Sequence, residues 1–430
     1  MSNVQKFLAK NGLQPETINP ETLLGLFETE MARGLDGDKN ALPMIPAFVT
    51  IERAVPVDKP VAVIDAGGTN LRVATVRFDS HGRSHIENYS RHPMPGTQGE
   101  LSADAFFGTL ADLVAPVAAR TEAIGFCFSY QAEVTPDRDA RLRCWTKQVK
   151  APEVVGRMIG GELRERLQRR GLERRVTVLN DTVATLLAGK SANAKQRYGS
   201  YVGLILGTGT NTAYIERNAN IHKRTDLDPK DAMAINVESG SFSKAPRSRF
   251  DEIFDAIHAD AGEYKFEKMI SGAYLGGLGG TILREAAKAG LFSAAAAPGF
   301  TKLPLVETKD LDAFCQQPFQ PPAIFAAIPM TDDDRRTALA LCMPVYTRAA
   351  LYAAVNIAAA VIRTGSGSDP LYPVAVTIDG STYYRTKTAA FASRIQAHLR
   401  AILEPRGLHF DLLHVDEAPI IGAAVAGLTN

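Results

Sequence analysis

A Gly-rich segment that occurs twice constrains the fold of this chain more than any other feature. When VAVIDAGGTNLRVATVRFD, which begins at Val61, is laid over YVGLILGTGTNTAYIE so that Val61 falls on Val202, four further residues match. The matched residues of the first copy are Ile64, Gly68, Thr69 and Asn70. Each copy has the pattern of an apolar strand, a Gly-rich turn and a second strand. The repeat predicts two halves that share one topology.

Helical patterns lie before, between and after the two hairpins. They cover residues 105–119, 154–169, 253–258, 266–291, 337–363 and 388–403, and an earlier one opens at Pro20 and ends near Gly34. Strands that alternate with helices in both halves predict an α/β fold. At 430 residues, the chain is long enough for two or three domains.

Composition and charge argue against several kinds of partner. With 48 basic and 47 acidic residues, the net charge gives no reason to expect binding to nucleic acid or to an anionic membrane. The start MSNVQKFLAKNG lacks the apolar region of a signal peptide, and the longest apolar run, 349–362, is too short to span a bilayer. The four cysteines are far apart, so we expect reduced thiols and no zinc site. These features predict a cytoplasmic protein.

The first turn, Asp65-Ala-Gly-Gly-Thr-Asn-Leu-Arg72, has the residue types of a phosphate site. Gly67 and Gly68 let the backbone approach a ligand, and the N–H groups of such a turn can hold phosphate oxygens. The Thr69 hydroxyl and the Arg72 guanidinium add further donors. Asp65 can hold Mg²⁺ through water, because this ion keeps much of its hydration shell. The alternative is a tight hairpin with a surface arginine, but the repeat favours the phosphate interpretation.

The second turn, Gly207-Thr-Gly-Thr-Asn211, is rich in hydroxyls and poor in bulky side chains. This composition suits the β- or γ-phosphate of a nucleotide. On its own, the turn is weak evidence for a binding site. Two such turns that face each other would form a clamp for a nucleotide, and a clamp of this kind needs no excess of lysine.

Asn180 and Asp181 stand where the strand RVTVL ends and a helix begins. One interpretation is that Asp181 or Thr182 only caps that helix. The other is that Asp181 accepts the proton of an attacking hydroxyl, since open α/β sheets bind ligands at the C-terminal ends of their strands. Because one carboxylate cannot easily serve both purposes, we expect Thr182 to supply the cap if Asp181 is a base.

Further polar residues stand among apolar ones and could bind sugar hydroxyls. Carboxylates and amides bind adjacent hydroxyl groups in fixed directions. Each such residue alone is more often solvated or part of a cap, and spacing does not show that they converge. The candidates are Ser129, Thr146, Lys147, Glu238 and Glu267.

Taken in order, the motifs resemble those of hexokinase and glucokinase from about Leu42 to about Leu428. The series is LPMIPAFV, IDAGGTNLRV, GFCFSY, LRCWTK, VLNDTVATL, ILGTGTNTAYIE, INVESGSF, FEKMISGAYLGG, LVETKDLDAF, TRAALYAA and TIDGSTY. Any one of these would be modest evidence. The whole series in this order is specific to the family.

The resemblance implies transfer of the γ-phosphate of ATP to the 6-hydroxyl of glucose or a related hexose, with Asp181 as the general base. Asp65 would serve Mg²⁺ through water. The hexose would be held by Ser129, Thr146, Lys147, Asn180, Asn211, Glu238 and Glu267. The nucleotide would be held by Asp65, Gly67, Gly68, Thr69, Asn70, Arg72, Gly207, Thr208 and Gly209, with Thr308, Gly380 and Ser381 on the adenosine side.

The resemblance also implies the duplicated actin-like fold, which is α/β and ribonuclease H-like. In this fold a large and a small domain close over the sugar, and the C-terminal helix returns to the small domain. We expect the large domain to comprise residues 1–55 and 192–415, and the small domain residues 56–191 and 416–430. The expected partners are a hexose and MgATP, with the protein a monomer or a homodimer.

The chain departs from the family pattern at several positions. Ser129-Tyr130-Gln131 lacks the proline of the usual Ser-Phe-Pro, Ser239 replaces a tryptophan, Gly277 replaces an acidic residue, and Asp416-Glu-Ala-Pro419 replaces a Gly-Ser-Gly turn. The proposed base and both turns are intact, which argues against a non-enzyme. Two alternatives stay open: a sugar- or nucleotide-binding regulator with little catalysis, and a kinase of another hexose such as mannose, fructose or an amino sugar.

Overall fold

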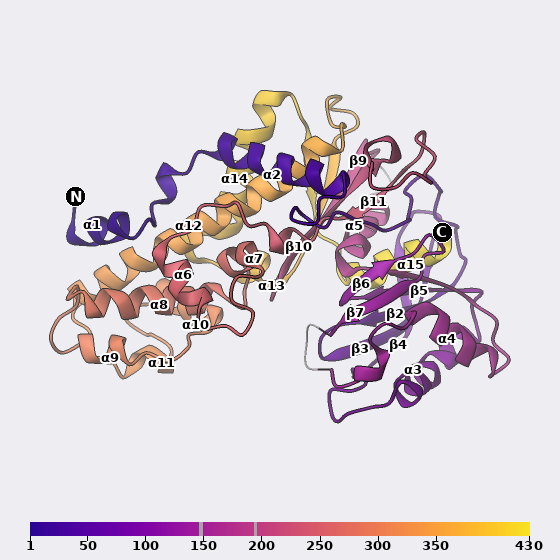
Figure 1. Cartoon of the computed structure of the whole chain (residues 1–430), viewed down its shortest axis with the longest axis horizontal. Coiled ribbons are helices and arrows are strands. Elements are labelled where there is room, and N and C mark those ends of the chain that lie inside the picture. The colour runs from indigo at the N-terminus through magenta and orange to yellow at the C-terminus, as the bar shows by residue number, and fades with distance from the viewer. Residues whose placement is uncertain (146–148, 193–195) are drawn as a thin grey trace.

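The computed structural model describes residues 1–145, 149–192 and 196–430, and two mixed sheets organise it (Figure 1). The first sheet has the order β4 (Ser84–Pro93), β3 (Asn70–Phe78), β2 (Val61–Ala66), β5 (Ala123–Phe128) and β8 (Arg175–Leu179). The second has the order β1 (Ile45–Pro46), β11 (Ala232–Asn236), β10 (Thr210–Arg217), β9 (Ser200–Leu206), β12 (Val374–Asp379) and β13 (Phe410–Leu413). We call the first sheet, with the helices that pack on it, the first lobe, and the second sheet, with its helices, the second lobe.

Both sheets have the same internal topology. In the first, β4, β3 and β2 are antiparallel neighbours, and β2, β5 and β8 run parallel. In the second, β11, β10 and β9 are antiparallel, and β9, β12 and β13 run parallel. This agreement confirms the shared topology and the α/β class that the repeat predicted. The exact division into domains stays a prediction.

Helices cover both faces of the first sheet, and the side chains of its central strand β2 point alternately to one face and to the other. Ala62 and Ile64 of β2 belong to a core with α3 (Ala103–Ala118) and α4 (Ile159–Gln168). Val61 and Val63 belong to another core with α5 (Asp181–Ala192) and α15 (Ala418–Thr429). Since successive side chains of a strand point to opposite faces, the two helix pairs lie on opposite sides of the sheet.

Helices α5 and α15 pack between the two sheets. Helix α15 contacts β2, β5 and α5, while α5 also contacts β9 and β12 of the second sheet. The approach is close enough to require glycine: a Cβ on Gly422 would lie 1.7 Å from the Ala184 carbonyl oxygen, and one on Gly125 would lie 1.8 Å from that of Ala423. The C-terminal helix therefore returns to the first lobe.

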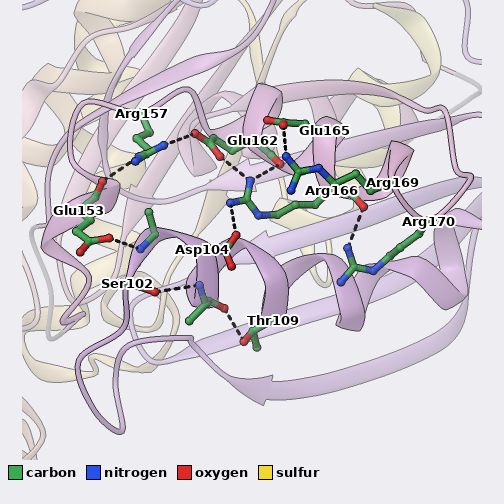
Figure 2. Close-up of polar contacts among 12 residues, drawn as sticks. Ser102, Asp104, Thr109, Glu153, Arg157, Glu162, Glu165, Arg166, Arg169 and Arg170 are labelled. Carbon is green, nitrogen blue, oxygen red and sulfur yellow. Dashed lines mark hydrogen bonds and ion pairs between the residues drawn. The ribbon is translucent and has the colours of Figure 1, made fainter.

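The outer layer of the first lobe is held by a polar network between α3 and α4 (Figure 2). Arg166 of α4 is almost fully buried and reaches Asp104 of α3 at 3.0 Å and Glu162 at 2.6 Å. The Glu162 carboxylate also accepts from Arg157 at 2.9 Å. Glu153 accepts a bond of 2.9 Å from the backbone N–H of Ala103. These contacts fix α3 against α4 and so support the sheet from outside.

The second lobe carries most of the helices. They are α1 (Asn3–Lys10), α2 (Pro20–Leu35), α6 (Arg249–Asp255), α7 (Lys265–Ile270), α8 (Leu275–Lys288), α9 (Ala297–Thr301), α10 (Thr308–Gln316), α11 (Ala323–Ala326), α12 (Asp332–Arg363), α13 (Ser381–Arg385) and α14 (Phe391–Leu403). A two-stranded ribbon, β6 (Gln131–Val134) with β7 (Ala140–Cys144), follows β5 of the first lobe. The predicted apolar run 349–362 lies inside α12.

Among the described residues, α12 is the helix that is long and apolar enough to cross a membrane by length and composition alone. Its most apolar window is 89% buried inside the protein. The helix packs against α2, α8 and α14 and against strands of the second sheet. Its apolar surface is therefore covered by the second lobe, as in a core helix.

Candidate active site

The turn between β2 and β3 combines a buried carboxylate with a guanidinium. Strand pairing places Asp65 directly opposite Arg72, and the two side chains form an ion pair. Arg72 also donates to Glu417 at 2.5 Å. Burial raises the pKa of the Asp65 carboxyl, and the charge of Arg72 acts in the opposite direction. The carboxylate is therefore costly to keep charged, and Arg72 is what offsets that cost.

Neighbouring segments hold this first turn in place. The Tyr130 hydroxyl donates to the Gly67 carbonyl at 2.7 Å, and the Met94 N–H donates to the Thr69 carbonyl at 3.0 Å. The Asn70 amide donates to the Thr69 hydroxyl at 2.8 Å. Thr69 itself is exposed, and Gly67 and Gly68 are partly exposed. The turn is fixed in position but open to solvent at its tip.

The turn between β9 and β10 is packed more closely. The Gly207 carbonyl accepts from the Gly272 N–H at 2.8 Å and from the Thr382 hydroxyl at 2.7 Å. The Thr208 carbonyl accepts from the Ala273 N–H at 3.0 Å. Gly209 has no room for a side chain, because a Cβ there would lie 2.6 Å from a carboxylate oxygen of Glu267. Segments far apart in the sequence thus fix this second turn.

These contacts explain why the predicted helix 266–291 is wrong as a single element. The chain forms α7 and α8 with a break at residues 271–274. The backbone N–H groups of Gly272 and Ala273, which a continuous helix would use internally, donate to the second turn instead. A Cβ on Gly272 would lie 2.2 Å from the Thr382 hydroxyl oxygen, so the break also depends on glycine.

Two of the three residues expected on the adenosine side, Thr308 and Ser381, line one surface cavity of about 530 Å³ beside the second turn. Thr208, Thr308 and Ser381 are among its lining residues, together with Lys309 and Arg385. Thr308 begins α10, and its hydroxyl accepts from the Gly276 N–H at 2.8 Å. Gly380 is the residue before α13, with a φ of +121°. The structure therefore brings this predicted group together next to the second turn.

Asp181 begins α5 directly after β8, at the C-terminal end of that strand. The prediction that Thr182 caps the helix is wrong: the Asn180 side chain accepts from the Thr182 N–H at 2.8 Å. The Thr182 hydroxyl instead donates to Asp181 at 3.3 Å. Asn180 takes the capping position because its short amide folds back onto the first turn of the helix. Asp181, one residue inside the helix, is partly exposed and is not the cap.

The charge of Asp181 reaches three other carboxyl groups. Burial is the largest cause that raises the pKa values of Asp65, Glu238 and Asp379, and the negative charge of Asp181 raises each of them further. Asp65 belongs to the first turn, Glu238 follows β11, and Asp379 ends β12. Asp181 therefore lies between the two lobes, near the first turn, near Glu238 and near the strand that leads into Gly380.

Asn211 and Glu238 of the predicted hexose set meet in one amide and carboxylate network. The Asn211 amide donates to Asn236 at 2.7 Å and to Glu238 at 3.2 Å, and Asn236 donates to Glu238 at 2.7 Å. Glu238 has a left-handed backbone with a φ of +57°, a strained conformation for this residue type. Glu267 of α7 accepts from the Thr210 N–H at 2.8 Å. Both carboxylates are thus held against β10.

Asn180 and Glu238 also line one small cavity of about 20 Å³, together with Tyr130 and Asn236. The cavity takes residues from both lobes. Ser129, at the end of β5, donates its backbone N–H to the Ala66 carbonyl at 3.2 Å. Thr146 and Lys147 lie outside the described residues, so their predicted sugar contacts stay predictions.

Sequence reasoning missed four residues that stand among this group: Asn236, Tyr264, Asp379 and Glu417. Asn236 precedes Glu238 by two positions in the same motif, so strand periodicity could have placed both on one face. Asp379 is the residue directly before Gly380 in the motif TIDGSTY. Tyr264 and Glu417 gave no local signal, because their partners are distant in the sequence.

Among the described residues, no group of three or more His, Cys, Asp or Glu side chains could hold a metal ion by itself. Mg²⁺ does not require such a group, since it is commonly held by one or two carboxylates together with water and substrate phosphates. Asp65 fits this pattern, because its carboxylate stands near the end of β2 at the base of the first turn, and Arg72 favours its charged form. Asp65 is therefore the residue that could serve a magnesium ion.

Two protein-family models, both described as hexokinase, match residues 3–191 and 201–429. Human hexokinase-3 is 31% identical over 428 residues, covering 93% of this chain and 44% of that protein. Hexokinase-5 of Oryza sativa subsp. japonica is 33% identical over 305 residues, covering 66% of this chain and 59% of that protein. The chain thus matches only about half the length of these relatives. A solved hexokinase from Schistosoma mansoni superposes with a TM-score of 0.78 at 25% identity and covers 99% of both chains.

Proposed function

The chain belongs to the hexokinase family and has its actin-like fold, and from this premise we propose that it transfers the γ-phosphate of ATP to the 6-hydroxyl of a hexose. The position of Asp181 is the main support for this proposal. This carboxylate stands at a strand end between the lobes, and its charge reaches the first turn, Glu238 and Asp379. A base in that position can serve a hydroxyl held on one side and a nucleotide held on the other.

In this proposal, Asp181 accepts the proton of the 6-hydroxyl as its oxygen attacks the γ-phosphorus in line. Catalysis of phosphoryl transfer consists mainly of positioning and of neutralising charge on the phosphoryl oxygens. The N–H groups of both turns and the Arg72 guanidinium supply that neutralisation. Thr308, Gly380 and Ser381 hold the adenosine side, where the cavity of about 530 Å³ lies.

Asp65 would hold Mg²⁺ through water beside the first turn. When bound, the ion would supply positive charge that offsets the charge of the phosphate oxygens. Asp65 is suited to this task because β2 fixes its carboxylate at the base of the first turn, and the charge of Arg72 favours the ionised form that a cation needs. Arg72 in turn keeps a fixed position through its second contact, with Glu417.

The hexose would be held by Asn211, Glu238 and Glu267 of the second lobe and by Ser129 and Asn180 of the first. The predicted contacts of Thr146 and Lys147 belong to the same proposal. Because the ligands come from both lobes, the site is complete only when the lobes are together. We propose that the domains 56–191 with 416–430 and 1–55 with 192–415 close on the sugar, which guards against transfer to water.

Glucose is the first hexose to test, since the solved Schistosoma mansoni hexokinase is complexed with glucose. The segment beside Ser129 differs from the usual family pattern at Gln131, so mannose, fructose and an amino sugar belong in the same panel. We expect hexose-dependent release of ADP in a coupled assay at matched sugar concentrations. Sugar or nucleotide binding without ADP release from any member of the panel would favour the regulator alternative.

The decisive variant is Asp181→Ala. We expect it to lower turnover by at least ~100-fold, the low end for loss of a general base, while sugar binding changes little. Turnover follows from the coupled assay, and sugar affinity from calorimetry. Asp104→Asn is the matched control, because the Asp104 carboxylate on α3 is almost fully exposed, and this change should leave turnover unchanged. Near-normal turnover of Asp181→Ala would refute the assignment of the base.

A further inference from the structure

A side chain of the first lobe reaches across to the second lobe beside the proposed hexose site. Gln131 opens β6, two residues after Ser129, and its amide nitrogen donates to the hydroxyl of Tyr264 in the second lobe. Its amide oxygen accepts from the Cys144 thiol at 3.0 Å. Gln131 and Cys144 are direct partners in the β6–β7 ribbon. Both ends of the amide are therefore engaged, one within its own lobe and one across to the other.

Tyr264 is held in an unusual backbone conformation. It precedes α7 with φ +48° and ψ +38°, in the left-handed region that a bulky residue seldom adopts. Such a conformation is strained and persists only where surrounding contacts enforce it. Helix α7 is the element that carries Glu267. A contact that fixes Tyr264 therefore also fixes the start of the helix that presents a proposed hexose ligand.

The surroundings of Tyr264 place it at the proposed hexose site. Burial is the main cause that raises the pKa of its phenol; the hydrogen bond from Gln131 lowers this pKa, and the charges of Glu238 and Glu267 raise it. The phenol stays protonated at neutral pH, because its ordinary pKa of 10.0 is raised. Its oxygen can accept from Gln131 while its hydrogen remains available to a neighbouring acceptor.

We propose that Gln131 and Tyr264 form a latch between the lobes that sets the affinity of this protein for its hexose. The latch is a property of this chain, because the proline usual at the position of Gln131 has no amide to donate. The inference rests on the proposed function for its effect on the hexose, but the contact itself is independent of catalysis. Both residues act by positioning, since they hold the lobe carrying Ser129 and Asn180 against the lobe carrying Glu238 and Glu267.

The expected size of the effect follows from the worth of one hydrogen bond. A neutral hydrogen bond contributes about 1 kcal/mol, which corresponds to roughly a fivefold change in affinity. Gln131 and Tyr264 contribute to the same bond between the lobes, and the Cys144 contact that is lost with Gln131 lies within one lobe. Loss of either residue should therefore have the same effect on hexose affinity as loss of both. Two independent effects of this size would instead multiply to about 25-fold.

The test is a double-mutant cycle with Tyr264→Phe, Gln131→Met and the double variant. Both substitutions keep the volume of the side chain and remove only its polar group. We expect each single variant and the double variant to raise the KM for hexose about fivefold, with kcat and the KM for ATP changed by less than about twofold. Tyr372→Phe, which removes an exposed hydroxyl from the second lobe, is the control and should change none of these. Multiplying effects, or an unchanged KM for hexose, would overturn the proposal.

Small-angle X-ray scattering of the ligand-free protein tests the latch without catalysis. We expect the radius of gyration to increase in Tyr264→Phe, in Gln131→Met and equally in the double variant, and to stay at the wild-type value in Tyr372→Phe. A radius that is the same in all five proteins would overturn the latch even if the enzyme is a hexokinase. An increase in the three latch variants, with no hexose phosphorylated by the wild type, would support the latch and refute the proposed function.

Discussion

The turn between β2 and β3 has charged residues at its base, whereas apolar residues occupy the same positions beside the turn between β9 and β10. When the two copies of the repeat are superposed, Asp65 falls on Leu206 and Arg72 falls on Ala213. Asp65 and Arg72 form an ion pair, while Leu206 and Ala213 are fully buried in the cores. The first turn therefore has charge to offer a ligand, whereas the backbone, the two hydroxyls and the Asn211 amide of the second turn are all neutral.

The two turns also differ in the space around them. Beside Gly67 a Cβ would meet only the Asn70 carbonyl oxygen, at 3.4 Å, which is an ordinary contact. Beside the second turn, a Cβ on Gly380 would lie 2.4 Å from both the carbonyl carbon and the oxygen of Leu206. Identical Gly-Thr-Asn residues thus serve one turn that is charged and open and another that is neutral and closely packed. The neighbours, and not the turn residues, make the difference.

The largest expected effect comes from filling space behind the second turn. Gly380→Ala adds a Cβ against backbone atoms and forces a residue with a side chain to adopt a φ of +121°. We expect the free energy of unfolding to fall by at least ~3 kcal/mol, from strain and overpacking together. Urea denaturation measures that loss, and the KM for ATP should rise in the protein that stays folded.

Gly67→Ala is the matched change at the first turn. Because that position has ordinary space, we expect its free energy of unfolding to change by less than ~1 kcal/mol. The contrast in packing between the turns would be refuted if both variants lost the same stability, or if Gly67→Ala lost more.

The next largest effect concerns the difference in charge between the two turns. Arg72→Met removes the guanidinium but keeps a long side chain, and we expect kcat/KM for ATP to fall by about 100-fold, as for loss of one strong donor to a developing negative charge. Thr208→Val, which removes a neutral hydroxyl from the second turn, should cost only about fivefold. Steady-state kinetics at saturating hexose measures both.

Arg72→Lys is the control, because it keeps the positive charge but not the planar guanidinium. It should recover part of the kcat/KM that Arg72→Met loses. If Thr208→Val proved as damaging as Arg72→Met, then charge would not be what distinguishes the first turn. The comparison would then have to rest on packing alone.

The asymmetry between the turns shows which features local sequence can predict. Period-two strands, the Gly-rich turns and the shared topology were predictable, because each depends on residues adjacent in the chain. The break between α7 and α8 was not, because Gly272 and Ala273 donate to a turn more than 60 residues earlier. Glu417 was missed for the same reason, since its partner Arg72 is 345 residues away.

In the candidate site, too, some features were predictable from local sequence and others were not. Asp181 could be proposed as a base from its place at a strand end, but the cap fell to Asn180 and not to Thr182. Local preference allows several residues to cap a helix, and only the conformation of the chain selects one. Thr308 and Ser381, both expected on the adenosine side, meet at one cavity, which the ordered motif series implied and spacing alone did not.

The smallest expected effect has the opposite sign and concerns the cost of the buried charge. Burial raises the pKa of Asp65, so its charged form is disfavoured in the folded protein despite Arg72. Asp65→Asn removes that cost, and Arg72 keeps Glu417 as a partner. We expect the variant to be more stable than the wild type at pH 7 by about 1 kcal/mol, a rise of a few °C in Tm. Its hexose kinase activity should nevertheless fall, because the proposed Mg²⁺ residue is gone.

The pH dependence of this gain identifies its cause. A carboxyl whose folded pKa is raised keeps its proton longer in the folded protein than in the unfolded chain, so wild-type stability falls as pH rises from the ordinary Asp pKa of about 3.9 to the folded pKa. The stability of Asp65→Asn lacks this pH-dependent loss, because the variant has no carboxyl group at position 65. The difference in Tm between variant and wild type should therefore grow across that window and stay constant above it, as measured by calorimetry from about pH 4 to pH 8. A wild type that is the more stable protein at pH 7 would show that the attraction of Arg72 exceeds the cost of burial, and that the charged turn stabilises the fold as the closely packed one does.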